Sequence, residues 1–137
     1  MGTGCDTIIA QFVADSLDTD IDNIAVFGVD TDTPPYDSGS YASSTTYLTG
    51  MAAVKAAEQM REKLLQLAAK ILEEDITKLE FDGKRVFCEE TGKEVSLFDL
   101  ATASMVNNEI ALEVTYSHSS PVSPPPFMAA CAEVEVD

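Results

Sequence analysis

Residues 45–74, TTYLTGMAAVKAAEQMREKLLQLAAKILEE, decide the fold of this chain because they form its longest periodic stretch. Met60, Leu64, Leu67 and Ile71 recur at intervals of four and three, and charged residues occupy the other faces. This spacing predicts an amphipathic helix of about 45 Å at roughly 1.5 Å per residue. A glycine near its start, at position 50, costs about 1 kcal/mol relative to alanine and therefore indicates close packing or a break.

Two shorter helices are predicted on either side of the long one. Thr7 is a suitable N-cap for a helix that runs to about Leu17. Ser96 and Asp99 have the spacing of a capping box for a helix through about Met105. In the first of these helices, Ile9, Phe12 and Val13 lie on one face at helical spacing.

Strands are predicted over residues 24–29, 110–116 and 130–136, from apolar content in the first and alternation in the other two. Turns are predicted at the Asp-Gly pair 82–83, between LEF and RVFC, and at the Thr-Gly pair 91–92. Helices and strands interleave, so the fold class is α+β, with a mixed β-sheet packed against helices. Because the chain begins in a loop and stops on a strand, it is expected to be a single partial domain over 1–137.

Composition narrows the classes of partner. The formal charge of −16 opposes binding to nucleic acid or to an anionic membrane. No apolar run approaches the roughly 20 residues of a membrane span, and the first residues show no basic segment followed by an apolar one. Cys5, Cys88 and Cys131 lie far apart without a C-x-x-C pair, which predicts reduced thiols rather than a disulfide framework or zinc site. A cytoplasmic location is therefore expected.

Two stretches have the chemistry of an anion site at a helix N-terminus. MGTGCDT, residues 1–7, has two glycines that would let the backbone approach a phosphate. A plain loop-to-helix turn is the more frequent interpretation of such a stretch. DSGSYASSTT, residues 37–46, gathers hydroxyls and small side chains with almost no charge, as an ordinary serine-rich loop also does. The third glycine of the dinucleotide fingerprint is missing, which disfavours a nucleotide-binding oxidoreductase of that type.

The sequence predicts neither a metal site with protein ligands nor a catalytic motif. Asp18, Asp20 and Asp22 imitate a calcium loop, but an asparagine and a valine replace its glycine and its final glutamate. His118, the only histidine, has no cysteine or carboxylate at metal-ligand spacing. We therefore expect a solvated acidic loop and no protein-ligated metal.

Three motifs taken in order resemble one family, the molybdenum hydroxylases, which include xanthine dehydrogenase, aldehyde oxidoreductase, nicotinate dehydrogenase and 4-hydroxybenzoyl-CoA reductase. The family's G-Q-G-x-x-T segment opening a helix is similar to GTGCDTIIAQFVADSL. Its D-T-x-x-x-P segment, followed by small residues, is similar to DTDTPPYDSGSYASSTTYLTGMAA, and its A-x-x-E-V-E-V-D segment to AACAEVEVD. The resemblance implies a fragment of the molybdopterin-binding large subunit, with residues 76–108 outside the match.

The resemblance also implies which residues bind the cofactor. Thr3 occupies the family's glutamine position, where its shorter side chain cannot make the amide contacts. Tyr41 stands where some members have a small residue, so it is expected to shape substrate access. The implied cofactor-binding residues are Gly2, Thr3, Gly4, Thr7, Ala42, Ser43 and Thr45.

The implied cofactor is molybdopterin with molybdenum, and the bacterial pattern suggests its cytosine dinucleotide form. Iron-sulfur clusters and FAD would lie on other domains or subunits, which are the implied partners together with a small-molecule substrate. The family's catalytic glutamate lies downstream of E-V-E-V-D, so no catalytic residue is assigned, and Glu113, Glu133 and Glu135 do not fit its motif. An isolated fragment is expected to have no turnover, and its exposed apolar surface favours a homodimer.

Two other functions remain open on the sequence. The chain could be a split-subunit binding or assembly module that completes a cofactor site with a partner chain. It could also be an acidic α+β interaction domain without a ligand. The sequence does not select the substrate.

Overall fold

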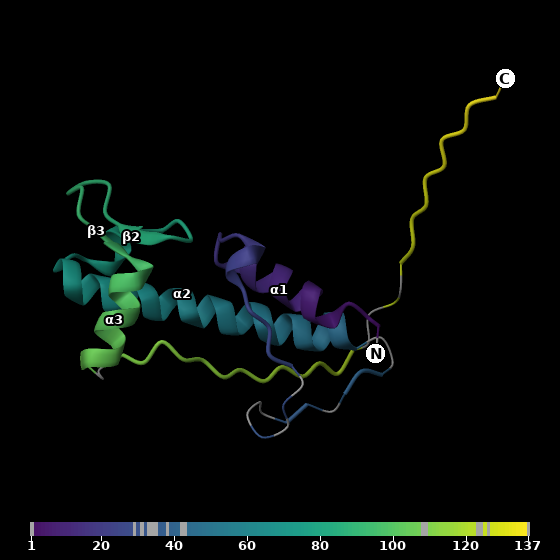
Figure 1. Cartoon of the computed structure of the whole chain (residues 1–137), viewed down its shortest axis with the longest axis horizontal. Helices are drawn as coiled ribbons and strands as arrows, with labels where there is room; N and C mark the ends of the chain where they lie inside the picture. Colours follow the sequence, from purple (N-terminus) through teal and green to yellow (C-terminus); the bar gives the residue numbers. More distant parts are fainter. Residues whose placement is uncertain are drawn as a thin grey trace.

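The computed structural model describes residues 2–28, 30, 32, 36–37, 39–41, 44–107, 110–122, 125 and 127–136. A long helix forms the spine of the molecule, with a second helix along its first half and a small sheet at its far end (Figure 1). The α+β class predicted from the sequence is confirmed. No helix in this part of the chain is long and apolar enough to cross a membrane.

The predicted long helix is confirmed as two consecutive helical segments. A π-helical turn, η2 (Thr45–Thr49), runs directly into α2 (Gly50–Leu72), and Glu73 ends the helix in a left-handed conformation at φ 54°. Lys93 donates a hydrogen bond of 2.7 Å from Nζ to the carbonyl of Leu72, one of the terminal groups that the helix leaves without an internal partner. The helix ends at Leu72, within two residues of the end predicted from the periodic apolar positions.

Helix α1 (Cys5–Ser16) packs against α2 and η2 through small side chains. Ala10, Ala14 and Ala57 are buried, and a Cβ placed on Gly50 would lie 2.6 Å from Cε2 of Phe12. Because Gly50 has no side chain, the ring of Phe12 on α1 lies directly on α2. The prediction of close packing at position 50 is therefore confirmed. A short 3₁₀ turn, η1 (Ile21–Asn23), follows α1.

The sheet is a three-stranded antiparallel meander of β1 (Glu80–Phe81), β2 (Arg85–Phe87) and β3 (Glu94–Ser96), preceded by the turn η3 (Ile76–Lys78). Both predicted glycine turns connect its strands, with φ 83° and 69° at positions 83 and 92. Where a mixed sheet was predicted, the three strands found in the described residues are antiparallel throughout. Short connections explain this, since a parallel pair needs a crossover of a dozen or more residues.

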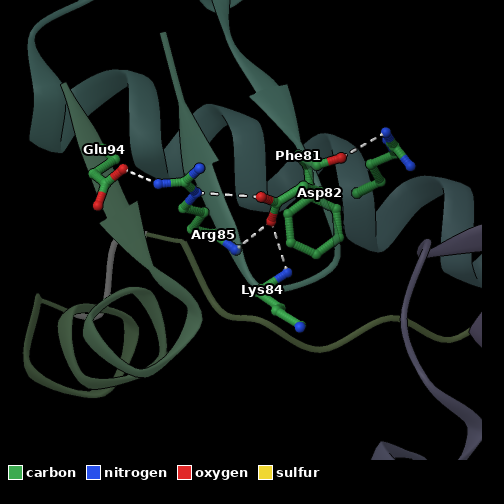
Figure 2. A network of polar contacts seen from close by, with 6 residues as sticks. Phe81, Asp82, Lys84, Arg85 and Glu94 are labelled. Atoms are coloured by element: carbon green, nitrogen blue, oxygen red, sulfur yellow. Dashed lines mark hydrogen bonds and ion pairs between the residues drawn. The ribbon is translucent and has the colours of Figure 1, made fainter. Parts of the chain in front are cut away.

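Polar contacts between Asp82, Lys84, Arg85 and Glu94 hold the first turn and its neighbouring strands together (Figure 2). Asp82 accepts 3.0 Å hydrogen bonds from the backbone N–H groups of Lys84 and Arg85, and these bonds lower the pKa of its carboxyl. The turn is therefore closed by its own first side chain, which is the usual role of aspartate in such loops.

Helix α3 (Leu97–Asn107) follows β3 and completes the core. Its predicted capping pair is confirmed, because the Ser96 hydroxyl accepts a bond from the Asp99 N–H and donates to the Asp99 carboxylate. The core lies between α3, the sheet and the second half of α2, and contains Leu64, Leu67, Ala68, Leu79, Phe81, Val86, Cys88, Val95 and Leu100.

Three segments predicted as strands are extended but are not paired in a ladder within the described residues. Residues 24–28 pass along α1, residues 110–120 return along α2, and residues 127–136 lead away from the body (Figure 1). Burial alternates along 110–116 as predicted and continues to 120, whereas the predicted half-buried face of 130–136 is wrong, because residues 127–136 are exposed throughout. Alternation indicated the buried face in 110–116 but not in 130–136, and a strand also needs a neighbour for its backbone groups.

Candidate functional site

The glycine loop at the start of α1 has an open backbone. Gly2 and Gly4 adopt positive φ angles of 71° and 69°, and Gly4 is the N-cap of the helix. A Cβ at either position would meet no atom of the described residues within 4 Å. These glycines are required by the backbone conformation rather than by internal packing, and they leave room for a ligand to approach the loop.

The structure corrects the role of Thr7. Because Gly4 takes the left-handed conformation at little cost, Gly4 and not Thr7 is the N-cap, and the helix begins at Cys5. Thr7 therefore lies in the first turn, exposed, and not at the N-cap. Thr3 is also exposed, between the two glycines, where its side chain faces solvent.

Two carboxylates lie near the first turn of α1. The pKa of the Cys5 thiol is raised, first by its burial and then by the charges of Asp6 and Asp37. Asp37 therefore lies near the N-terminal end of α1. The two carboxylates offset the positive end of the helix dipole, so this tip favours a neutral part of a ligand over a phosphate.

The second predicted stretch forms a hydroxyl pair at the start of η2. The Thr45 hydroxyl donates a hydrogen bond of 2.7 Å to Oγ of Ser40, and both residues are half-buried. The Ser44 N–H, just before the first residue of η2, donates to the carbonyl of Tyr41 at 3.0 Å. Since the Thr45 proton is used within the chain, the Ser40 hydroxyl proton is the one that can point to a ligand.

Sequence reasoning did not single out Ser40. It belongs to the hydroxyl-rich stretch, but only the fold shows that it pairs with Thr45 across five positions. Tyr41 is exposed, and its predicted role in substrate access stays a prediction. Ala42 and Ser43 lie outside the described residues, so their predicted roles stay predictions.

Both stretches lie at the same end of the molecule. The N-termini of α1 and of the η2–α2 helix are close to each other in Figure 1, because the two helices run side by side in the same direction. Contacts of Phe12 with Gly50 and of Asp18 with Arg61 fix this direction. Amide groups from the first turns of two helices are thus brought together, as an anionic or strongly polar ligand requires.

The donor set at this end is neutral. All eight lysines and arginines lie between residues 55 and 93, and the first of them, Lys55, pairs with Glu58 at 2.7 Å, so hydroxyls and backbone N–H groups are the available donors. This chemistry fits a polar pterin with a phosphate, provided that the phosphate lies on the Ser40–Thr45 side. In the described part of the chain, no group of three or more His, Cys, Asp or Glu side chains is placed to hold a metal ion.

Comparison with known proteins identifies the family of this chain. The family model of the molybdopterin cofactor-binding domain matches residues 1–137. The gamma subunit of the 6-hydroxypseudooxynicotine dehydrogenase complex of Paenarthrobacter nicotinovorans is 32% identical over the whole chain, which covers 18% of that subunit. A probable hypoxanthine oxidase of Escherichia coli is 35% identical over the whole chain, which covers 14% of that protein.

Solved structures support the same assignment. A crystal structure of Cu,Mo-CO dehydrogenase matches 88% of this chain with a TM-score of 0.75 and 33% identity, over 16% of the solved chain. Quinoline 2-oxidoreductase from Pseudomonas putida shares the fold at a TM-score of 0.66. The chain spans less than a fifth of the length of these relatives. It belongs to the molybdopterin cofactor-binding domain family, as its three sequence motifs predicted.

Proposed function

We propose that this chain forms one corner of the molybdopterin site in the large subunit of a molybdenum hydroxylase. In this proposal residues 1–137 are part of a larger cofactor-binding domain. The enzyme would oxidise an N-heterocycle or an aldehyde with oxygen derived from water. A relative named as a probable hypoxanthine oxidase supports oxidation of an N-heterocycle.

One observation carries the proposal. The open glycine loop at Gly2 and Gly4 lies at the same end of the molecule as the Ser40–Thr45 hydroxyl pair, in a chain of the molybdopterin-binding family. The first-turn N–H groups of the η2–α2 helix and the Ser40 hydroxyl would hold the phosphate. The glycine loop would lie against the pterin rings, where the nearby carboxylates of Asp6 and Asp37 do not oppose a neutral surface.

The residues of this chain bind and orient, and no catalytic group is assigned among them. When bound, the molybdenum cofactor supplies the hydroxylation chemistry, with electrons leaving through iron-sulfur clusters and FAD on other domains or subunits. Glu113, Glu133 and Glu135 are exposed, on the two extended segments after α3. We therefore propose that the isolated chain has no turnover and that activity requires the remaining parts of the complex.

The test measures pterin rather than activity. The chain is co-expressed with the rest of its complex in a host that makes molybdopterin, and the pterin released from the purified complex is measured by fluorescence. Thr45→Val removes the hydroxyl that orients Ser40 at almost constant volume, and Thr115→Val does the same at an exposed position on the 110–120 segment. We expect Thr45→Val to lower pterin content about fivefold, near the effect of one lost hydrogen bond, with Thr115→Val unchanged. Equal pterin content in the two variants would refute the assignment of Thr45.

A further inference from the structure

The return segment after α3, residues 110–120, is fastened along α2 and is called the strap here. Even-numbered residues of the strap are half-buried and odd-numbered residues are exposed. Lys63 of α2 donates from Nζ to the carbonyls of Ala111 and Glu113, at 3.0 and 2.6 Å. Ser104 of α3 donates to the carbonyl of Ile110 at 2.9 Å and accepts from the Leu112 N–H at 3.2 Å. The beginning of the strap is thus fixed on both sides.

The other end of the strap contacts the π-helical turn. His118 meets the ring of Tyr47 edge to face, with ring centroids 6.4 Å apart and planes at 81°. The hydroxyls of Tyr47 and Ser120 share a hydrogen bond of 3.4 Å. All three side chains are half-buried. Edge-to-face pairs of this kind contribute beyond simple burial, so the strap ends in a specific contact rather than in a loose loop.

The turn that the strap contacts is the one that presents the hydroxyl pair. In a π-helix, with its i→i+5 bonds, Thr45 and Tyr47 lie about half a turn apart, on opposite sides. Thr45 bonds Ser40 on one side, and Tyr47 contacts the strap on the other. Single wide turns of this type occur frequently at functional sites, because the extra residue re-aims the side chains and N–H groups around it.

We propose that Tyr47, His118 and Ser120 are positioning residues for the cofactor corner, the proposed site formed by Gly2, Gly4, Ser40 and Thr45. Their contacts, on the side of η2 that faces the strap, hold η2 in its wide turn. This inference rests on the proposed function. The strap end fixes the direction in which Thr45, Ser40 and the first-turn N–H groups face the phosphate of a pterin cofactor. None of the three side chains needs to touch the cofactor, since each acts through the turn.

The experiment compares two ends of the same strap in the co-expressed complex. Tyr47→Ala and His118→Ala remove the contact at η2, whereas Leu112→Ala removes core packing at the far end of the strap. Hydrogen–deuterium exchange of residues 44–49 reports the turn itself, released pterin reports the site, and the thermal midpoint reports general destabilisation. His118→Phe keeps an aromatic edge and serves as the conservative rescue.

We expect faster exchange at 44–49 and about a fivefold loss of pterin in the Tyr47 and His118 alanine variants, the scale of one lost contact. Leu112→Ala should lower the thermal midpoint without either change, and His118→Phe should restore pterin content. The inference is overturned if the loss of pterin follows the thermal midpoint equally in all variants, or if exchange at 44–49 is the same in Tyr47→Ala as in Leu112→Ala. A wild-type complex without any pterin would instead refute the proposed function, while the exchange data would still decide whether the strap holds the turn.

Discussion

The turn between β1 and β2 carries the sharpest stability prediction. Gly83 is buried, at φ 83°, and a Cβ there would lie 2.0 Å from the backbone oxygen of Asp18, just beyond the end of α1. In Gly83→Ala the left-handed conformation costs about 1–2 kcal/mol. Displacing backbone costs roughly another 1–3 kcal/mol, and the stiffer unfolded chain returns about 0.4–1 kcal/mol. We therefore expect a net loss of about 3 kcal/mol in the free energy of unfolding.

Gly92→Ala is the matched control, because it places alanine in the other glycine turn of the same sheet. Gly92 has φ 69°, but a Cβ there meets nothing within 4 Å among the described residues. Only the conformational cost applies, so we expect a loss of about 1 kcal/mol. Urea denaturation followed by circular dichroism measures both variants. Equal losses would refute the argument that the turn is packed against the end of α1.

Four further outcomes are expected. Arg61 donates to the Asp18 carboxylate at 2.9 Å and to a β1 carbonyl at 3.0 Å, so Arg61→Lys, which cannot form both bonds with the same geometry, should lose about 1 kcal/mol in urea denaturation. Ser96→Ala removes the cap of α3 and should cost about 1 kcal/mol in the same assay. The pKa of Asp82 is lowered in the folded state by backbone N–H bonds, so its contribution is full above its ordinary value of 3.8 and is lost as pH falls through the folded value. Asp82→Asn should therefore show a shallower loss of stability below pH 3.8 in urea titrations. Pterin retention should rise, or stay level, with added salt, because salt screens the acidic residues around the cofactor corner and the donors there are uncharged. A steep fall of retention with salt would contradict a neutral donor set.

Local features of the fold could be predicted from the sequence because their causes are local. The apolar spacing from Met60 to Ile71 gave the helix, the Ser96–Asp99 pair gave the start of α3, and the glycines at 83 and 92 gave the turns. Each of these depends on residues within about one helical turn or one hairpin of each other. Their partners are therefore visible in the sequence itself.

Features that depend on contacts between distant residues could not be predicted in the same way. The N-cap at Gly4 depends on a left-handed backbone angle that serine or threonine would rarely adopt at that position. Because hydroxyl residues are frequent N-caps, Thr7 was predicted as the cap, and this prediction was wrong. The extended segments show the same limit, because alternation cannot reveal whether a neighbouring strand exists. The contact of His118 with Tyr47 joins residues separated by about half of the chain, and no spacing rule reaches that far.

The position of charge explains why the cofactor corner needs so many accurately placed neutral groups. A lysine or arginine can hold a phosphate from several positions, because Coulomb attraction falls slowly with distance. A hydroxyl or an N–H group acts only within hydrogen-bond distance and over a narrow range of angles. With every basic residue after position 54, this chain depends on the second kind of donor at its glycine end. An uncharged donor cannot compensate for a misplaced angle, so its direction must be fixed by its surroundings. Three contacts do this here, namely Gly50 against Phe12, the bond between Ser40 and Thr45, and the strap against Tyr47.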